Sequence, residues 1–119
     1  MIRLKRAYDP PSPDDGRRIL VERLWPRGIT KQRAALDLWL KEIAPTPALR
    51  KWFAHDPKKW KQFQQRYWKE LQDNPAAAVL RDKVREGPVT LIYAAKDEQH
   101  NGALALMQFL EKRLQKHGK

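Results

Sequence analysis

The segment that most constrains the fold is residues 89–95, which read Val-Thr-Leu-Ile-Tyr-Ala-Ala and follow a proline. Its side chains are apolar on both alternating faces, which is typical of a strand that is covered on both sides. Strands of this kind are central strands of α/β proteins, where a helical connection separates one parallel strand from the next. The segment therefore predicts a central strand of a mostly parallel sheet.

Two further strands are predicted near the amino terminus, at residues 2–8 and 18–24. The segment between them contains three prolines in four positions and predicts a loop, because proline can neither donate to a strand ladder nor continue a helix. The tetrapeptide Trp25-Pro26-Arg27-Gly28 ends the second strand. Pro26 removes a hydrogen-bond donor there, and Gly28 tolerates a positive φ.

Four helices are predicted between the second and third strands, and a fifth follows the third strand. The first runs from a cap at Thr30 to about Ile43, and the others begin at Pro47, Pro57 and Pro75, each after a capping residue. The clearest is the one after Pro57, whose aromatic and leucine side chains repeat at helical spacing. The last helix extends to about residue 115. Its predicted inner stripe comprises Ala103, Leu106, Met107, Leu110 and Leu114.

This element order predicts an α/β fold: a single domain with a small, mostly parallel central sheet flanked by about five helices. The second and third strands should be parallel, because a long helical connection joins them. Three strands make a thin sheet, so a fourth strand is expected within a segment that otherwise reads as loop or helix. A chain of 119 residues is the usual size of one domain.

The charge of the chain favours anionic partners. It contains 25 Lys and Arg residues against 14 Asp and Glu residues, a formal net charge of +11, and the excess is spread over both halves. An anionic small molecule or a nucleic acid is the partner that such a charge attracts. The structural alternative is a soluble protein with a positive surface and no dedicated partner.

Several classes of site are disfavoured by composition. The chain has no cysteine, which excludes disulfides, thiol nucleophiles and cysteine-ligated metals. Ser12 is the only serine and lies in the proline-rich loop, and no glycine-rich phosphate loop is present. We expect neither a cofactor nor a metal, since the only spaced pair of metal-ligating side chains is Asp97 and His100. No apolar run is long enough for a signal peptide or a membrane span, so we expect a cytoplasmic protein without a membrane partner.

Two polar turns follow the carboxyl ends of the second and third strands, at residues 25–28 and 96–101. Ligands of open α/β sheets bind in the crevice at these strand ends, so a pocket is expected there if the two strands are neighbours. Arg27 and Lys96 would hold an anion, and a ring of the ligand would stack on Trp25 or Tyr93. Predicted ligand-binding residues are Arg23, Trp25, Arg27, Tyr93, Lys96 and Asn101, and predicted catalytic residues are Asp97 and His100.

Each of these residues also has a purely structural interpretation. Asp97 is a good helix N-cap, and His100 can face solvent. Asn101 can hydrogen-bond locally, and Arg27 can tie its turn to a nearby carbonyl. Arg23, within the predicted strand, would then form a buried ion pair with Asp or Glu.

The helix after Pro57 interleaves basic and aromatic side chains. Its aromatic residues Trp60, Phe63 and Tyr67 fall on the predicted inner stripe, and the lysines fall on the outer face. A buried core stripe with a solvated basic face is one interpretation. A face that contacts phosphates is the other, and stacking of bases on those rings is not expected if they are buried.

Several segments of the sequence resemble those of a known family. They are residues 21–28 (Val-Glu-Arg-Leu-Trp-Pro-Arg-Gly), 39–45, 49–53, 63–67 and 90–101. With them the chain resembles the YeaO-like branch of domain-of-unknown-function family 488, over nearly its whole length. The resemblance implies one cytosolic α/β domain over residues 1–119 and no established activity. The family's motif positions correspond here to Arg23, Trp25, Arg27, Lys41, Arg50, Tyr93, Lys96, Asp97, His100 and Asn101.

The leading functional hypothesis is a pocket that binds a phosphate-bearing or nucleotide-like anionic ligand. If the protein is an enzyme, hydrolysis or group transfer without a cofactor fits best, with Asp97 and His100 handling the proton. The first alternative is a non-catalytic nucleic-acid-binding module that uses a distributed basic surface. The second is a structural or interaction protein. The sequence decides neither whether the chain is an enzyme nor its oligomeric state.

Overall fold

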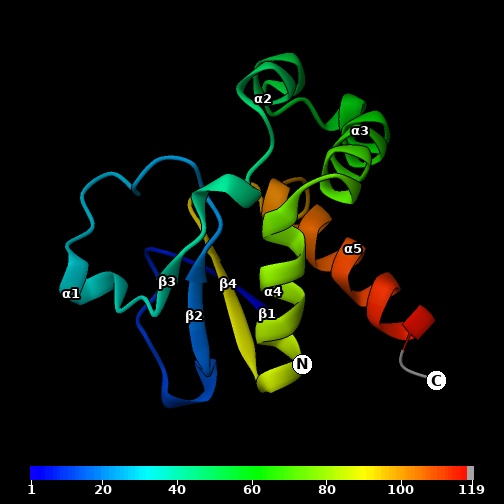
Figure 1. Ribbon diagram of the computed structural model, residues 1–119. Helices are drawn as coiled ribbons and strands as arrows, with labels where there is room; N and C mark the ends of the chain where they lie inside the picture. The colour runs from blue at the N-terminus through cyan, green and yellow to red at the C-terminus, as the bar shows by residue number, and fades with distance from the viewer. Residues whose placement is uncertain (118–119) are drawn as a thin grey trace.

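A four-stranded parallel sheet forms the centre of the computed structural model, which describes residues 1–117 and the side chains of residues 1–114 (Figure 1). The strands stand in the order β1-β4-β2-β3. Their bounds are Ile2–Arg6 for β1, Arg17–Leu20 for β2, Leu38–Trp39 for β3 and Val89–Tyr93 for β4. Within the described residues, five α-helices accompany the sheet: α1 (Lys31–Ala34), α2 (Pro47–Phe53), α3 (Trp60–Gln72), α4 (Pro75–Glu86) and α5 (Gly102–His117). The predicted single α/β domain with a small parallel sheet is confirmed.

Strand β4 is the buried centre of the sheet, as its sequence predicts. All five of its residues are buried, and it pairs in parallel with β1 on one side and β2 on the other. The predicted parallel arrangement of the second and third strands is therefore confirmed. The strand ends at Tyr93 instead of residue 95, because the guanidinium of Arg6 hydrogen-bonds to the next two main-chain carbonyl oxygens. Its Nε donates to the oxygen of Ala95 at 2.9 Å, and its Nη2 donates to that of Ala94 at 3.4 Å.

The helix predicted from Thr30 to Ile43 is wrong, and this segment contains the expected fourth strand. Helix α1 ends at Ala34, where the following Ala35 is left-handed with a φ of 47°. Arg18 of β2 then captures the chain: its Nη2 donates to the carbonyl oxygen of Ala34 at 2.8 Å, and its main-chain N–H donates to the Asp37 carboxylate at 2.8 Å. Leu38–Trp39 can therefore pair with β2 as β3, although the apolar spacing is helical.

The first two strands are shorter than predicted. Strand β1 ends at Arg6, although the Ala7 N–H still donates to the oxygen of Tyr93. Strand β2 ends at Leu20 instead of residue 24, so the segment that carries Glu22 and Arg23 is a loop at its carboxyl end. The loop between β1 and β2 also contains one 3₁₀ turn, Pro13–Asp15, in which the proline occupies the first position and its missing N–H is not needed.

Two apolar clusters cover the two faces of the sheet. The larger includes Ile19 and Leu91 of the sheet and side chains of α2, α3, α4 and α5. The smaller includes Leu20 and Ile92 and is covered by α1 and the loop before it. Figure 1 accordingly shows α4 and α5 on one side of the sheet and α1 on the other. The predicted inner stripe of the last helix is confirmed, since its members belong to or pack against the larger cluster.

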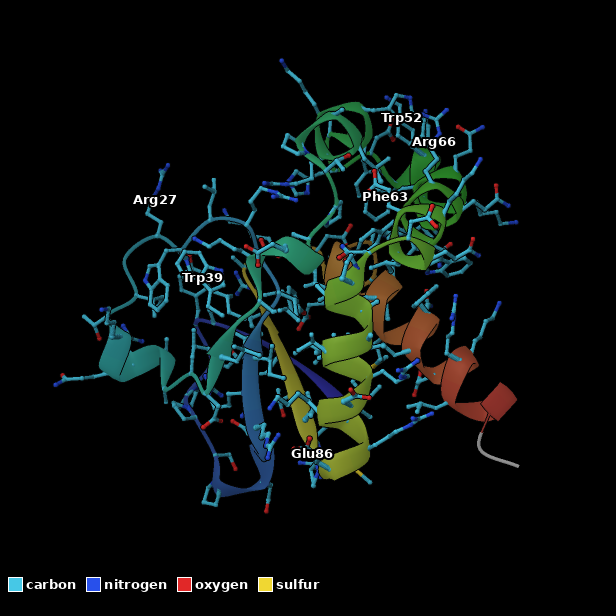
Figure 2. The ribbon with its side chains drawn as sticks, in the orientation of Figure 1. Arg27, Trp39, Trp52, Phe63, Arg66 and Glu86 are labelled. Atoms are coloured by element: carbon cyan, nitrogen blue, oxygen red, sulfur yellow. The ribbon has the colours of Figure 1, made fainter. Side chains whose placement is uncertain are left out.

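The aromatic stripe of α3 is core. Phe63 and Tyr67 are 2% and 1% exposed, and Figure 2 shows Phe63 directed inward. The hydroxyl of Tyr67 donates a 2.6 Å hydrogen bond to the carbonyl oxygen of Ile43. Trp60 is half-buried and packs on Phe63, with 5.8 Å between the ring centroids. Stacking of nucleic-acid bases on Phe63 and Tyr67 is therefore excluded.

Candidate functional site

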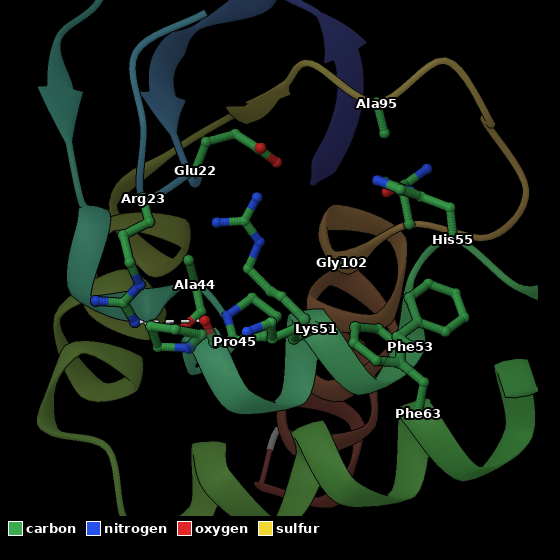
Figure 3. Close-up of a pocket in the computed structure, with 13 residues that line it drawn as sticks. Glu22, Arg23, Ala44, Pro45, Lys51, Phe53, His55, Phe63, Ala95 and Gly102 are labelled. Carbon is green, nitrogen blue, oxygen red and sulfur yellow. Dashed lines mark hydrogen bonds between the residues drawn. The ribbon is translucent and has the colours of Figure 1, made fainter.

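A cavity of about 330 Å³ opens at the carboxyl ends of β2 and β4 (Figure 3). This is the edge where ligands of open α/β sheets bind. Its polar lining comprises Glu22, Arg23, Arg50, Lys51, His55 and Asn101. Its apolar lining includes Ala44, Pro45, Pro47, Phe53, Phe63 and Ala95. The predicted position of the pocket thus contains a cavity, with contributions from α2 and α3 as well as from the strand ends.

Helix α2 places Arg50 and Lys51 on the cavity. Its first turn is fixed because the Thr46 hydroxyl oxygen accepts the main-chain N–H of Leu49 at 3.3 Å, and Pro47 occupies the first helical position. After the helix, Ala54 and His55 both adopt left-handed backbone angles, with φ of 48° and 56°. This reversal turns the chain back and leaves His55 at the edge of the cavity.

Arg23 is held by main-chain oxygens and not by an acidic side chain. Its Nη2 donates to the carbonyl oxygens of Ala44 at 3.2 Å and Pro45 at 3.4 Å. Its Nε is buried and has no hydrogen-bond partner among the described residues. The interpretation of Arg23 as one half of a buried ion pair is therefore wrong, because the residue lies in a loop beside two carbonyls and keeps its positive charge uncompensated at the cavity.

Glu22 is the one carboxylate of the cavity within the described residues. Its side chain is half-buried, and Figure 3 shows it extending into the cavity. Burial raises the pKa of Glu22, and the positive charge of Arg50 partly offsets that rise. With Arg23 and Lys51 also on the wall, the cavity has an excess of positive charge.

Asn101 forms the amino-terminal cap of α5 at the cavity wall. Its Oδ1 accepts the N–H of Leu104 at 2.8 Å, and its Nδ2 donates to the carbonyl oxygen of Asp97 at 2.9 Å. The structural interpretation that made Asp97 the cap of this helix is thus wrong. Asn101 is 4% exposed, so both ends of its amide are used to fix the turn that precedes the helix.

Asp97 and His100 contact each other but do not line the cavity. One carboxylate oxygen of Asp97 accepts the N–H groups of Gln99 at 2.9 Å and His100 at 3.1 Å, and the other contacts His100 Nδ1 at 2.9 Å. The hydrogen bond from the Gln99 N–H and, after it, the one from the His100 ring lower the pKa of Asp97. The His100 ring stands edge-on to Trp60, with centroids 5.5 Å apart. The predicted acid–base pair is thus brought together beside the cavity.

The other four predicted ligand-binding residues lie outside the cavity lining. Trp25 donates through Nε1 to the Ile29 carbonyl oxygen at 2.6 Å, and Tyr93 is buried in β4, where burial and then the charge of Glu98 raise its pKa. Arg27 and Lys96 are exposed, and Figure 2 shows Arg27 extending away from the rest of the molecule.

Sequence reasoning did not assign Glu22, Lys51 or His55 to the site, and it reached Arg50 only through the family resemblance. Glu22 had a signal, because it is the only acidic residue in the apolar stretch 18–24. No sequence signal placed the charged residues of α2 at the site, because the packing of α2 on α3 decides which face of α2 meets the strand ends.

The structure therefore defines an α/β protein with a basic cleft at the carboxyl ends of its parallel strands. The family model described as "Inactive DUF488-N3 subclade" matches residues 1–119, and the chain belongs to this family. It is 46% identical over 110 residues to the uncharacterised protein YeaO of Escherichia coli K12, an alignment that covers 92% of this chain and 96% of that protein. It is also 38% identical over 112 residues to an uncharacterised protein of Mycobacterium tuberculosis, covering 94% and 95% of the two chains.

No solved structure matches this chain. Within the described residues, no three His, Asp or Glu side chains come close enough together to hold a metal ion. None of the helices that the structure describes has the length and apolar character needed to cross a membrane.

Proposed function

We propose that the protein binds a small phosphate-bearing or nucleotide-like anion in the cavity at the carboxyl ends of β2 and β4. The observation that carries the proposal is the convergence of Arg23, Arg50 and Lys51 on one cavity whose described lining holds a single carboxylate. A volume of about 330 Å³ is at the small end of the range in which proteins hold small ligands.

The cavity offers two kinds of surface to such a ligand. Arg23 and Arg50 have planar guanidinium groups that match phosphate oxygens, and Lys51 adds a mobile point charge. Pro47 and Ala95 give the cavity accessible apolar surface. The buried Phe53 and Phe63, whose ring centroids are 4.2 Å apart, complete its apolar lining. An anionic group with an attached ring or sugar suits this combination better than a bare inorganic ion does.

The proposal is binding without turnover. The family model that matches this chain is described as inactive, and the nearest acid–base pair, Asp97 with His100, lies outside the cavity lining. A general acid or base must come within hydrogen-bond reach of the reacting group. His55 is the only titratable side chain of the described lining other than Glu22 and the three cations, and it stands at the edge.

Thermal unfolding in the presence of small anions tests the proposal. The panel contains inorganic phosphate, ribose 5-phosphate, GMP, guanosine and a short DNA oligonucleotide, with the wild type and two variants, Arg50→Ala and Arg33→Ala. Arg33 is an exposed arginine of α1 and serves as the charge-matched control. A ligand at about 100 times its Kd stabilises a protein by about 2.7 kcal/mol, which raises Tm by about 10 °C in a domain of this size.

We expect the phosphate-bearing compounds to raise the Tm of the wild type and of Arg33→Ala by the same amount, and to raise that of Arg50→Ala by about half as much or less. Equal responses of the two variants would contradict the proposal. So would stabilisation by oligonucleotides alone, erased by salt in all three proteins, because that behaviour belongs to a distributed basic surface.

A further inference from the structure

Glu22 presents an unused acceptor inside a basic cavity. Its half-buried carboxylate makes no hydrogen bond and no ion pair with any residue that the structure describes, although cationic side chains share the wall. Its oxygens are not fully buried, but a carboxylate that loses part of its water without gaining a donor costs some stability. The arrangement is therefore more costly empty than it would be with a donor placed against the carboxylate.

The position of Glu22 is fixed by its own main chain. Trp39 of β3 donates from its indole Nε1 to the carbonyl oxygen of Glu22 at 2.7 Å. Trp39 is itself packed edge-on against Trp25, with centroids 5.5 Å apart. The carboxylate thus projects from an anchored segment and not from a loose rim.

The cations of the cavity do not use this carboxylate. Arg23 donates to the carbonyl oxygens of Ala44 and Pro45, and no nitrogen of Arg50 or Lys51 lies within 4.0 Å of a Glu22 oxygen. The cavity therefore keeps a separate acceptor at Glu22 and separate donors on the cations. A ligand that carried only negative charge would gain from the cations but would be repelled by Glu22.

We infer that Glu22 accepts hydrogen bonds from N–H groups of the ligand, so that the ligand carries an anionic group at one end and adjacent N–H donors at the other. This inference rests on the proposed anion-binding function and narrows its ligand class. A purine nucleotide of the guanine type has this chemistry, because its ring N–H and amino group offer two neighbouring donors to one carboxylate. Pro47 and Ala95 of the lining supply the accessible apolar surface that its ring would face.

Titration calorimetry with three probes and three proteins tests the inference. The probes are GMP, inosine 5′-monophosphate, which lacks the amino group, and ribose 5-phosphate, which has no ring N–H. The proteins are the wild type, Glu22→Gln and Glu111→Gln, in which Glu111 is an exposed residue of α5 away from the cavity. Glutamine keeps the size of glutamate but turns one acceptor into a donor.

We expect the wild type to bind GMP about tenfold more tightly than inosine 5′-monophosphate, because a hydrogen bond to a charged group contributes at least that much. Glu22→Gln should lose about the same factor for GMP and bind ribose 5-phosphate as tightly as the wild type or more tightly. Glu111→Gln should match the wild type with every probe.

Two results would overturn the inference while the proposed function stands: equal wild-type affinities for the two nucleotides, or a Glu22→Gln variant that binds GMP and ribose 5-phosphate more tightly by the same factor. In the second case the carboxylate acts only as a repulsive charge. Failure of all three probes to bind the wild type would instead contradict the proposed function itself. The comparison of the two nucleotides uses the wild type alone, so it holds even if Glu22→Gln does not fold.

Discussion

The indole Nε1 of Trp39 donates a 2.7 Å hydrogen bond to the main-chain oxygen of Glu22, so the edge strand β3 anchors the segment that carries the cavity's carboxylate. Trp68 makes a similar bond elsewhere, from its Nε1 to the carbonyl oxygen of Ala105 at 2.8 Å. The two tryptophans therefore offer a matched pair, one beside the cavity and one between α3 and α5.

Replacing either tryptophan by phenylalanine should lower the free energy of unfolding by about 1–2 kcal/mol, because each change removes one hydrogen bond and part of the packed ring. Urea unfolding measures this loss. Only Trp39→Phe should also weaken binding of a small anion, since only that change frees the Glu22 segment. If Trp68→Phe weakens binding equally, the anchoring role of Trp39 is wrong.

Substitutions of Arg27 and Arg50 distinguish the site predicted from the sequence from the cavity seen in the structure. The sequence predicts that Arg27 holds the anion. In the structure both arginines are exposed, but only Arg50 lines the cavity. We expect Arg27→Ala to keep wild-type affinity for ribose 5-phosphate and Arg50→Ala to lose about tenfold or more, as expected for a charge-assisted hydrogen bond. Calorimetry of the two variants checks this, and the reverse order would place the ligand at the 25–28 turn.

The buried carboxylate of Asp15 should make stability depend on acid pH. Burial alone would raise the pKa of Asp15, but hydrogen bonds from Lys5, from the Ser12 main chain and from Arg18 outweigh it and lower the pKa to about 2. The Arg18 contact is 2.6 Å long and both side chains are at most 5% exposed. Because the folded pKa lies below the unfolded value of 3.8, this stabilisation is complete above that value and is lost as pH falls toward 2.

Asp15→Asn should therefore be less stable than the wild type at neutral pH by about 3 kcal/mol, since it leaves Arg18 buried without its anion. The difference between the two proteins should shrink as the pH falls from about 4 to about 2, where the wild type loses the same charge. Denaturant unfolding at several pH values measures it. A difference that stays constant across this range would mean that the charge of Asp15 contributes nothing.

Gly16 and Gly28 should differ sharply when changed to alanine. Both have a positive φ, 63° and 79°, so alanine is strained at either position by about 1–2 kcal/mol. At Gly16 a Cβ would also collide with the carbonyl oxygen of Pro88, whereas at Gly28 nothing lies within 4 Å. The Pro88 oxygen accepts the Arg17 N–H at the start of β2, so it is not free to move.

We therefore expect Gly16→Ala to lower Tm more than Gly28→Ala, with a further loss of about 1–3 kcal/mol from the steric overlap. Thermal unfolding of the two variants decides the point. Equal losses would show that the loop before β2 can shift without cost.

The parts of the fold that local chemistry determines were predictable from the sequence. Helices α2 and α4 begin at Pro47 and Pro75 as predicted, because Thr46 and Asn74 satisfy the first free N–H groups within two or three residues. Strand β4 was predictable because its side chains are apolar on both faces, as expected for a strand that is buried on both sides. These signals need no knowledge of what the segment packs against.

The parts that distant contacts determine were not predictable. Strand β3 can form because the main-chain N–H of Arg18 donates to the carboxylate of Asp37, 19 residues later. No periodicity in residues 36–43 indicates that contact. The location of the site at the strand ends was predicted, and Arg23 and Asn101 line the cavity there. Arg50 was not assigned from the residues, since its place on the cavity depends on how α2 packs on α3.

An NMR titration of the ¹⁵N-labelled protein with ribose 5-phosphate shows whether the anion binds in the cavity, because it locates the bound anion without any substitution. If the anion occupies the cavity, the amide signals of Glu22, Ala95 and Gly102 should shift together and saturate along one binding curve, while those of α1 stay unchanged. Small shifts spread over the exposed lysines of α1 and α3, without saturation, would contradict the proposal and leave a basic surface that has no anion pocket.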